Sequence, residues 1–560
     1  MVRADERRWQ FKKTVDSDAG RRRRDETTLQ LRKTKKSEQL SKRRAASTNA
    51  QINTSEGDPE SVQQDANRQP PPSLAEVPHL IRVMQNSDAT PSEHLDAVRG
   101  VRRMLSVEEN PPAKQLIESG VLPLVIRFLT FDTEPRLQFE AAWALTNIAS
   151  THYTAQVVNA GAMPGLVRLL ECPTPYVREQ AAWCIGNIAG DSVELRDLVL
   201  KSGALTSLLR NVSNPGSMSL LKNVVWAISN LCRGTPKPDF VLIRDCIPAM
   251  NYAIVHEKSS NEARTDALWA LSYLSDGEDF RIQAVVDSGQ VVPHAMNALR
   301  CEEASLMAPA LRILGNIVTG NAEQTQAVLD AGIIEIVPKL LENSRKSIRK
   351  ETTWLLSNIA AGTSEQVSQI CKNHSLVCSL IDLSRYAPWE VRKEAIWCIS
   401  NLCSSGTATP KQIQMLVDND VIEAMSDVLD LTDAVLVLVA LDAIESILKL
   451  GKERGKPYDV FFEEADGISK LENLQHHTND KVYDKAVELI ETYYGVEDDE
   501  GDENLMPEES SDGYFAFGMS STTPKNLFGT SSPAAKFDFG GNSTPSFPRS
   551  PRFNANHMNT

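Results

Sequence analysis

A pattern of aromatic and amide residues recurs seven times in this chain, about every 42 residues. The recurring segments are AAWALTNIAS, AAWCIGNIAG, VVWAISNLCR, ALWALSYLSD, ALRILGNIVT, TTWLLSNIAA and AIWCISNLCS. The third residue of each segment is called its anchor, and the anchors are Trp143, Trp183, Trp226, Trp269, Arg312, Trp354 and Trp397. Successive anchors are 40, 43, 43, 43, 42 and 43 residues apart. A long in-phase repeat of this kind restricts the chain to an array of similar units, each stacked on its neighbours.

The period also indicates what each unit contains. Repeats of about 40–47 residues are typical of armadillo and HEAT proteins, whose units are two or three helices. A Gly that ends a helix in the left-handed conformation is expected in several units, at Gly161, Gly203, Gly289 and Gly332. The first turn of the following helix is then expected to hold Pro164, Pro293 or Pro338. Apolar residues recur at intervals of three and four, so the predicted fold is all-α, a right-handed superhelical armadillo solenoid.

Composition and charge divide the chain into four parts. We expect a basic segment at 1–55, a polar linker at 56–72, a solenoid of about ten repeats at 73–495, and an acidic, then FG-containing tail at 496–560. The basic arm and the tail are expected to be disordered. Residues 1–44 hold 16 Lys and Arg against 7 Asp and Glu, a net of +9, so the rest of the −15 chain carries −24. This asymmetry indicates an acidic partner for the arm, the body of the same chain included.

Several classes of protein are excluded by what the sequence lacks. It has no uninterrupted apolar run long enough for a membrane-spanning helix, and its charged N-terminus does not resemble a secretory signal. The nine Cys are scattered without a CxxC pair, which favours reduced thiols and argues against a zinc site. Phosphate-loop, nucleophile-elbow and HExxH motifs are missing, and titratable groups do not cluster. We therefore expect no enzyme, no catalytic residue, no metal and no cofactor.

The paired anchors predict a concave surface that binds an extended cationic chain. A Trp and an Asn at i and i+4 lie on one face of a helix. Neighbouring indole rings form slots for the stem and charged head of Lys or Arg, while Asn carboxamides bond to a peptide backbone. In the alternative, the Trp residues are core and the Asn residues are helix caps. It is less favoured, because an Asn in mid-helix is a poor helix former and is costly to bury unpaired.

We call the series of Trp and Asn pairs along the repeats the ladder. The ladder is interrupted in its middle, which predicts two separate pockets. Trp269 is followed by Tyr273 where other units have Asn, and Arg312 replaces the Trp before Asn316. Arg312 and Arg233 are expected to repel a cationic ligand between the pockets. Acidic side chains near the anchors are expected to reinforce the pockets, although each Glu is alternatively an exposed helix-face charge; these residues are Asp191, Glu140, Glu351 and Glu394.

At this level of detail the chain resembles the importin-α family of nuclear import adaptors. The interrupted Trp-xxx-Asn ladder, GNIAGDS at 186–192 and ALRILGNIVTG at 310–320 are similar to that family's armadillo repeats. RRRR at 21–24, LRKTKK at 31–36 and SKRR at 41–44 are similar to its importin-β-binding segment, and the resemblance covers about residues 7–496. It implies an adaptor that binds nuclear localisation signals of cargo proteins in a Trp/Asn-lined groove and links them to importin-β.

The resemblance also implies two signal-binding sites. The major site would consist of Trp143, Asn147, Thr154, Trp183, Asn187, Asp191, Trp226 and Asn230, with Asp191 pairing with the critical lysine of the signal. The minor site would consist of Asn316, Thr325, Glu351, Trp354, Asn358, Glu394, Trp397 and Asn401. The loop after Ser150 looks two residues shorter than the family pattern, so Thr154 is assigned by counting back from Val157.

The basic arm acquires two roles from the resemblance. Binding to importin-β would use Arg21, Arg22, Arg23, Arg24, Arg32, Lys33, Lys35, Lys36, Lys42, Arg43 and Arg44. When the arm is free, Lys42, Arg43 and Arg44 would fold back into the major site as a cargo mimic. The alternative is that the arm is the protein's own localisation signal or a nucleic-acid-binding tail. The −24 body argues against direct binding of nucleic acid.

The C-terminal region implies further partners. Residues 457–496 resemble the family's last repeat, which contacts the export receptor that recycles importin-α. FAFG at 515–518, LFG at 527–529 and FDFGG at 537–541 look like nucleoporin FG motifs, although an unselective low-complexity tail is an equal alternative. The implied location is the cytoplasm and nucleus, with shuttling through the nuclear pore and no membrane insertion. The alternative function is another armadillo-type protein-interaction scaffold, which would have few Trp-Asn pairs and no basic arm.

Overall fold

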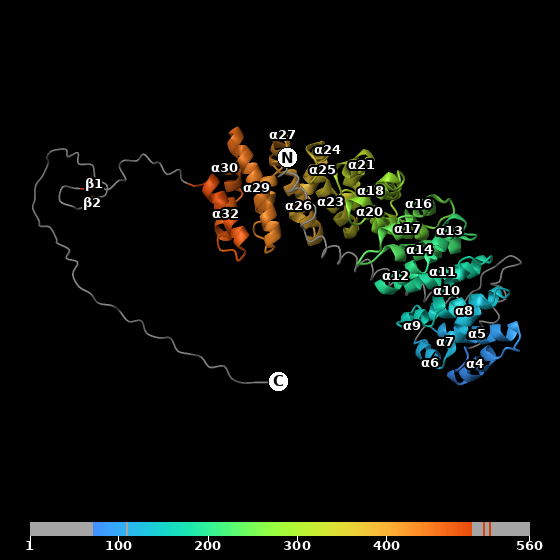
Figure 1. The fold of residues 1–560 in the computed structure, drawn as a ribbon. Coiled ribbons are helices and arrows are strands. Elements are labelled where there is room, and N and C mark those ends of the chain that lie inside the picture. The colour runs from blue at the N-terminus through green and yellow to red at the C-terminus, as the bar shows by residue number, and fades with distance from the viewer. Residues whose placement is uncertain (1–70, 108–109, 496–507, 510–514, 517–560) are drawn as a thin grey trace, which may run out of the picture. The chain divides into compact units, whose positions relative to one another are not determined.

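The computed structural model of this chain describes residues 71–107, 110–495, 508–509 and 515–516. The chain divides into two units, Met1–Gly495 and Val496–Thr560. In the first unit the described helices stack side by side in sequence order (Figure 1). The predicted basic arm and almost all of the predicted tail, with the LFG and FDFGG motifs, lie outside the described residues.

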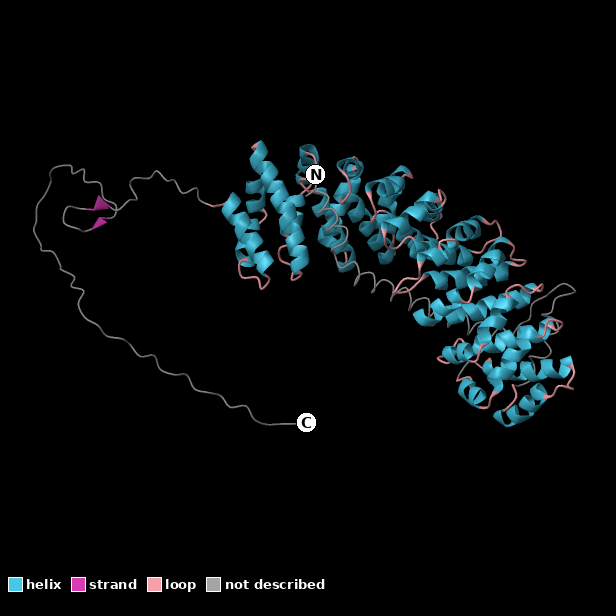
Figure 2. Ribbon diagram, viewed as in Figure 1, coloured by secondary structure: helices cyan, strands magenta, loops and turns pink. Residues whose placement is uncertain are grey.

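Helices make up all the regular structure of residues 71–107 and 110–495 (Figure 2). The array begins with the 3-10 turn η1 (Leu74–Glu76) and the pair α4 (Val77–Gln85) and α5 (Pro91–Leu105). The groups of three that follow are α6 (Ala113–Glu118), α7 (Val121–Arg127, continued by the 3-10 turn η2, Phe128–Thr130) and α8 (Pro135–Ile148); α9 (Thr154–Asn159), α10 (Ala162–Leu169) and α11 (Pro175–Ala189); α12 (Val193–Lys201), α13 (Ala204–Ser213) and α14 (Met218–Cys232); and α15 (Phe240–Ile243), α16 (Cys246–Val255) and α17 (Asn261–Leu274).

The same three-helix plan continues to the end of the first unit. Its later groups are α18 (Asp279–Asp287), α19 (Val291–Arg300) and α20 (Ala304–Ile317); α21 (Ala322–Asp330), α22 (Ile333–Leu341) and α23 (Lys346–Ala360); α24 (Ser364–Cys371), α25 (His374–Tyr386) and α26 (Trp389–Leu402); α27 (Pro410–Val417), α28 (Val421–Ser426) and α29 (Ala434–Arg454); and α30 (Tyr458–Glu464), α31 (Gly467–Leu474) and α32 (Asp480–Tyr493). This architecture confirms the predicted all-α armadillo solenoid.

The third helix of each group packs against the third helices of the neighbouring groups. Contacts run in order from α5 through α8, α11, α14, α17, α20, α23, α26 and α29 to α32. We call this series the ladder row, because the anchor residues of the sequence repeat lie on seven of its helices, α8 to α26. Each member is also packed by the second helix of its own group, for example α20 by α19 and α26 by α25.

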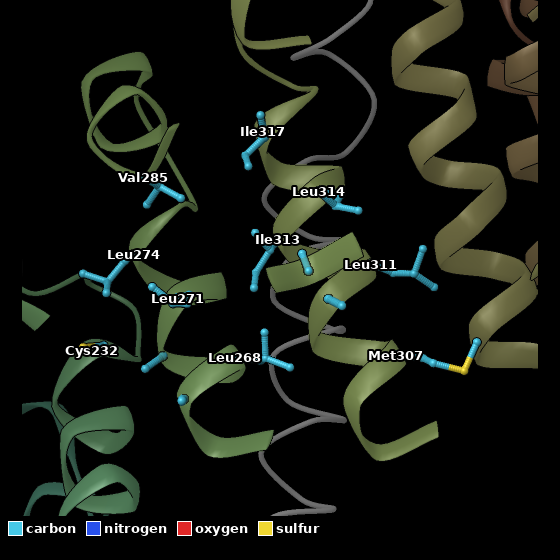
Figure 3. Packing of buried hydrophobic residues seen from close by; sticks show 14 of the residues in the cluster. Cys232, Leu268, Leu271, Leu274, Val285, Met307, Leu311, Ile313, Leu314 and Ile317 are labelled. Carbon is cyan, nitrogen blue, oxygen red and sulfur yellow. The ribbon is translucent and has the colours of Figure 1, made fainter. Parts of the chain in front are cut away.

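The core is continuous from repeat to repeat. Leu268, Leu271 and Leu274 of α17 are buried, as are Leu311 and Leu314 of α20, and Figure 3 shows these side chains in the packing of successive ladder-row helices. Buried residues spaced by three and four along both helices produce this continuity, as the apolar periodicity predicts. No helix of the described residues is long and apolar enough to cross a membrane.

The predicted helix ends are confirmed at the glycines. Positive φ angles of 86°, 80°, 66° and 83° are found at Gly161, Gly203, Gly289 and Gly332. A left-handed residue at this point lets the chain turn directly into the next helix, and no Cβ opposes that conformation. Two later repeats place Asp at the corresponding turn, with φ of 63° at Asp420 and 58° at Asp466.

The prediction for the prolines is confirmed in two cases and wrong in one. Pro164 and Pro293 are the third residues of α10 and α19, within the first turn. Pro338 lies inside α22, five residues after the helix begins at Ile333. The helix continues through Pro338 because Ile333, Val337 and Leu340 are buried along one face, so tertiary packing outweighs the missing backbone donor.

In the second unit, a two-residue ladder is the described regular structure. Strands β1 (Glu508–Glu509) and β2 (Phe515–Ala516) pair in the antiparallel sense, with Glu508 opposite Ala516 and Glu509 opposite Phe515. The sequence analysis does not predict this pair. Phe has a high preference for strands, but a two-residue strand leaves no alternating pattern from which pairing could be read.

Leu314→Ala tests the continuous core. The side chain of Leu314 is fully buried in α20, so its removal is expected to lower the free energy of unfolding by about 2–5 kcal/mol. The measurement is denaturant unfolding followed by circular dichroism, with Glu323→Ala, an exposed change on α21, as the control. Equal stability of the two variants would contradict the packing described for α20.

Candidate functional site

The anchor side chains lie at the surface of the ladder row rather than in the core. Trp143, Trp183, Trp226, Trp354 and Trp397 are half-buried. In every case the residue immediately before and the residue immediately after are fully buried. Each indole is therefore partly exposed, which argues against the alternative that these rings are fully buried core, although Trp397 also packs against the core residues.

The ladder Asn side chains are buried and connect successive repeats. The ladder position of a repeat is the residue four after its anchor, usually Asn and in one repeat Tyr273. Most of the ladder Asn side chains donate a hydrogen bond from Nδ2 to the backbone carbonyl of the residue just before the ladder position of the previous repeat. These bonds are Asn187 to Thr146 at 3.1 Å, Asn230 to Gly186 at 3.0 Å, Asn316 to Ser272 at 2.8 Å and Asn401 to Ser357 at 2.9 Å. The ladder Asn therefore has a structural role that the sequence analysis did not include.

Two ladder Asn side chains have other partners. Asn147 Nδ2 donates to Ser106 Oγ at 3.0 Å, and Asn358 Nδ2 donates to the carbonyl of Trp354 in its own helix at 2.9 Å. The Asn187 Oδ1 atom is buried and has no hydrogen-bond partner among the described residues. A buried acceptor without a partner costs about 1–3 kcal/mol of stability, and Asn187 is fully buried.

Thr154 and Asp191 lie together just beyond the end of α11, the helix that carries Asn187. The Thr154 hydroxyl is 3.3 Å from Asp191 Oδ1, although the two residues are 37 positions apart. Thr154 is buried, whereas Asp191 is exposed just beyond the end of α11. The segment after Ser150 thus brings Thr154 within 3.3 Å of Asp191.

Asp191 is distinctive among the repeats. It stands four residues after its ladder position, and the corresponding residues of the other units are not acidic: Thr151, Gly234, Gly277, Gly320, Gly362 and Ser405. A carboxylate at this offset therefore distinguishes the α11 repeat from the rest of the row.

Glu140 does not reinforce a pocket, contrary to the sequence prediction. Its side chain is only 2% exposed, and its carboxylate binds Arg102 Nε at 2.8 Å and Arg99 Nε at 3.1 Å. Both Arg residues come from α5, one repeat earlier, so the spacing of Glu140 from Trp143 could not reveal them. The Arg102 guanidinium also lies 4.3 Å from the centroid of the Trp143 ring, an internal cation–π contact.

The interruption of the ladder contains an ion pair and a ring pair. Arg312 donates to both oxygens of Glu351, at 3.0 and 2.8 Å, and both side chains are largely buried. The charge of Arg312 is thus opposed by Glu351, which corrects the prediction that Arg312 acts as an uncompensated repulsive charge. Trp269 and Tyr273 stack on each other with 6.1 Å between ring centroids, and Arg233 donates to the carbonyl of Gly190 at 2.8 Å.

The residues predicted for the minor site lie on four helices. Asn316, Glu351, Trp354, Asn358, Glu394, Trp397 and Asn401 are on the adjacent ladder-row helices α20, α23 and α26. Thr325 lies on α21 instead, fully buried, with its hydroxyl 3.0 Å from the carbonyl of Asn321. Glu394 is half-buried. The predicted importin-β-binding residues, Arg21 to Arg44, lie outside the described residues.

The sequence analysis missed two polar residues on the same face. Gln180 precedes Trp183 by three residues and donates from Nε2 to Thr146 Oγ1 at 2.8 Å, and Asn223 precedes Trp226 by three residues and donates to Glu179 Oε1 at 2.9 Å. Glu140, Glu351 and Glu394 also precede a Trp by three residues. A search of that position for any polar side chain, rather than for acids alone, would have found them.

Burial also sets the protonation of groups near the anchors. Burial raises the pKa of the Cys184 thiol, next to Trp183, to about 12, so this thiol stays protonated at neutral pH and is a poor nucleophile. The pKa of Arg103 is lowered by burial and then by the neighbouring charges of Arg102 and Arg99. Among the described residues, no group of three or more His, Cys, Asp or Glu is placed to hold a metal ion.

Comparison with known proteins identifies the family. Residues 7–99 match the importin beta binding domain, and residues 109–150, 150–190, 192–233 and 321–361 match the armadillo/beta-catenin-like repeat. Residues 456–508 match an atypical Arm repeat. Importin subunit alpha-3 of Arabidopsis thaliana is 39% identical over 531 residues, which cover 92% of this chain and 97% of that protein. The chain belongs to the importin-α family.

Other relatives agree with this importin-α assignment. Importin subunit alpha-1a of Oryza sativa subsp. japonica is 40% identical over 89% of this chain and 94% of its own length, and probable importin subunit alpha-A of Dictyostelium discoideum is 36% identical over 92% and 97%. An engineered protein of known crystal structure superposes with a TM-score of 0.66 at 26% identity, covering 74% of this chain and 98% of its own. With an importin-β-binding segment and armadillo repeats in one chain, this importin-α is an adaptor that binds nuclear localisation signals.

Glu140→Ala tests the correction made for this residue. Removing one partner of a buried ion pair leaves the Arg102 charge without its carboxylate, so we expect a loss of about 3–5 kcal/mol of stability. Denaturant unfolding measures it, with Glu118→Ala as control, because the Glu118–Lys114 pair is exposed. If both variants unfold at the wild-type denaturant concentration, Glu140 is not the buried ion-pair partner described.

Proposed function

We propose that this importin-α binds the basic signal of its cargo as an extended strand along α8, α11 and α14. The observation that carries the proposal is the exposed Asp191 carboxylate, held 3.3 Å from the Thr154 hydroxyl in the repeat where Asn187 Oδ1 has no partner. Because this carboxylate is exposed, a lysine ammonium of the signal can reach it. The major site then comprises Trp143, Asn147, Thr154, Trp183, Asn187, Asp191, Trp226 and Asn230.

Each part of this site contributes a different interaction. The Asp191 carboxylate forms a charge-assisted hydrogen bond with a lysine ammonium. The half-buried indoles of Trp183 and Trp226 pack against the methylene stems of neighbouring cationic side chains. The contact between Arg102 and Trp143 supports this chemistry, since it places a guanidinium over a ladder ring within the protein itself.

The minor site is proposed on α20, α21, α23 and α26. Trp354, Trp397 and Glu394 are half-buried there, and an acid beside two indoles suits a second cationic cluster. The other proposed members are Asn316, Thr325, Glu351, Asn358 and Asn401. Because Glu351 is bound to Arg312, it contributes less charge to a ligand than Asp191 does, and the minor site is expected to bind more weakly.

The basic arm is proposed both to bind importin-β and to inhibit the major site. The importin beta binding model matches residues 7–99, which include every basic cluster of the arm. Residues 1–44 carry +9, against −24 for the rest of the chain, linker and tail included. A tethered segment competes at high effective concentration, so Lys42, Arg43 and Arg44 occupy the major site until importin-β removes them.

Further partners and the location complete the proposal. The last repeat, which falls in the match at residues 456–508, exposes apolar side chains at Val460, Phe461 and Tyr483. We propose that it binds the export receptor that recycles the adaptor, and that the FG motifs of the tail bind nucleoporins. The protein then works without catalysis and shuttles between cytoplasm and nucleus.

Asp191→Lys is expected to abolish binding of a peptide with one cluster of basic residues. The substitution places a like charge where the signal lysine must sit. Fluorescence-polarisation titration of the full chain measures the effect, with Glu194→Lys, an exposed change of equal charge on α12, as the matched control. Binding retained within about threefold of wild type, which is less than 1 kcal/mol, would contradict the assigned role of Asp191.

Removal of residues 1–50 is expected to tighten binding of the same peptide severalfold, because the tethered competitor is lost. The full chain with Lys42→Ala, Arg43→Ala and Arg44→Ala should show the same gain in a parallel titration. An unchanged dissociation constant in both proteins would remove the inhibitory role of the arm.

A further inference from the structure

Two ladder-row helices carry a Gly immediately before the ladder Asn. These residues are Gly186 in α11 and Gly315 in α20. The corresponding positions in the other helices with the sequence repeat hold a hydroxyl side chain: Thr146, Ser229, Ser272, Ser357 and Ser400. One glycine falls in the proposed major site and one in the proposed minor site.

The indole ring of the next repeat lies where a side chain would stand at each Gly. A Cβ atom on Gly186 would lie 2.3 Å from Cζ3 and 2.7 Å from Cε3 of Trp226. On Gly315 it would lie 2.1 Å from Cζ3 and 2.7 Å from Cε3 of Trp354. Ordinary contacts of a Cβ are 3.4–4 Å, so neither ring can keep its position if the glycine gains a methyl group.

The closest ring atoms show how each indole is oriented. Cζ3 and Cε3 are adjacent atoms on one edge of the six-membered ring, and at Gly186 they are nearer than any other ring atom by several tenths of an ångström. The edge of the ring therefore points at the preceding helix. A ring that stands on its edge leaves its two faces unobstructed by that backbone, and the face is what attracts a cation.

Gly186 also contacts Asn230, the Asn of the same Trp–Asn pair as Trp226. Its carbonyl accepts the hydrogen bond from Asn230 Nδ2 at 3.0 Å, while its Cα lies against the Trp226 ring. The hydroxyl residues in other repeats use their side chains differently, since Ser272 Oγ and Ser357 Oγ donate to carbonyls of their own helices at 2.7 and 2.8 Å. At these positions the space next to the backbone is filled by a side chain.

We propose that Gly186 and Gly315 are positioning residues, one in each signal-binding site, whose missing side chains let Trp226 and Trp354 stand edge-on against the previous repeat. The inference rests on the proposed function of the two sites. Each site then contains one indole ring whose position relative to the previous helix depends on a glycine. A methyl group on that glycine displaces the ring from its alignment with the neighbouring indoles.

The test uses the full chain with Lys42, Arg43 and Arg44 changed to Ala, because a competing arm would lose affinity together with the peptide and mask the effect. In this background, Gly186→Ala is expected to weaken the binding of a peptide with one basic cluster by about fivefold or more, because residues in contact are commonly coupled. Gly315→Ala should leave that peptide within about twofold and should weaken only a peptide with two basic clusters.

Gly165→Ala is the matched control for crowding alone. A Cβ on Gly165 would lie 2.9 Å from Leu129 Cδ1, in α10 and away from the ladder row. We expect Gly165→Ala to change thermal stability while both peptides bind as before. If it weakens the peptides as much as Gly186→Ala does, general loss of packing explains the result and the proposal is wrong.

A mutant cycle with Trp226→Leu decides whether the glycine acts through the ring. Adding Gly186→Ala to Trp226→Leu should lower the peptide affinity and the midpoint of thermal unfolding by much less than it does in the parent, because the indole is gone and only Ala227 Cβ, 3.2 Å from the added atom, remains close. An equal additional loss in that background overturns the proposal. The unfolding midpoints test the same contact if Gly186→Ala by itself binds no peptide.

The two proposals fail in distinguishable ways. If the parent chain with its neutralised arm binds neither basic peptide, the proposed function is wrong, whereas the unfolding cycle still tests the contact between Gly186 and Trp226. If the parent binds both peptides and Gly186→Ala binds them equally well, only the positioning role is wrong.

Discussion

A hydrogen bond between an Asn side chain and the backbone of the previous repeat sets the register of the ladder row. Asn230 reaches the Gly186 carbonyl, and Asn187, Asn316 and Asn401 make the equivalent bond elsewhere. Because each bond joins adjacent third helices, it also places the residue one turn before the Asn, which is a Trp in α11, α14 and α26 and Arg312 in α20. The spacing of the indoles along the row therefore depends on contacts within the protein before any ligand is present.

Contacts between neighbouring repeats also decide which carboxylates of the ladder row are paired with an Arg and which are exposed. Glu140 and Glu351 are neutralised by Arg residues of the preceding repeat, whereas Asp191 remains exposed at the end of its helix. A buried carboxylate next to a cation is part of the stacking, and an exposed one is available to a ligand. Burial and the presence of an Arg partner thus distinguish the carboxylates that stabilise the stack from the one that is open to a ligand.

These two features explain why an adaptor of this family requires an array rather than a single domain. An extended peptide presents a side chain to the same face about every 6.6 Å, so recognition must be spread over several repeats. Each repeat supplies a ring and an amide, and the differences at Asp191, Gly186, Arg312 and Gly315 make the repeats unequal. The peptide-binding face is a property of the series, although every unit has the same fold.

The sequence alone determined the helical array, the position of the anchors and the family, because these follow from a local pattern repeated in phase. It also placed Thr154 and Asp191 in one site through the resemblance. The sequence did not predict three features: the burial of Glu140 in an ion pair, the Arg312–Glu351 pair, and the continuation of α22 through Pro338. The two ion pairs join side chains about 40 residues apart in adjacent repeats, and the helix through Pro338 depends on the burial of one face of α22. Only the stacking of the helices decides these contacts.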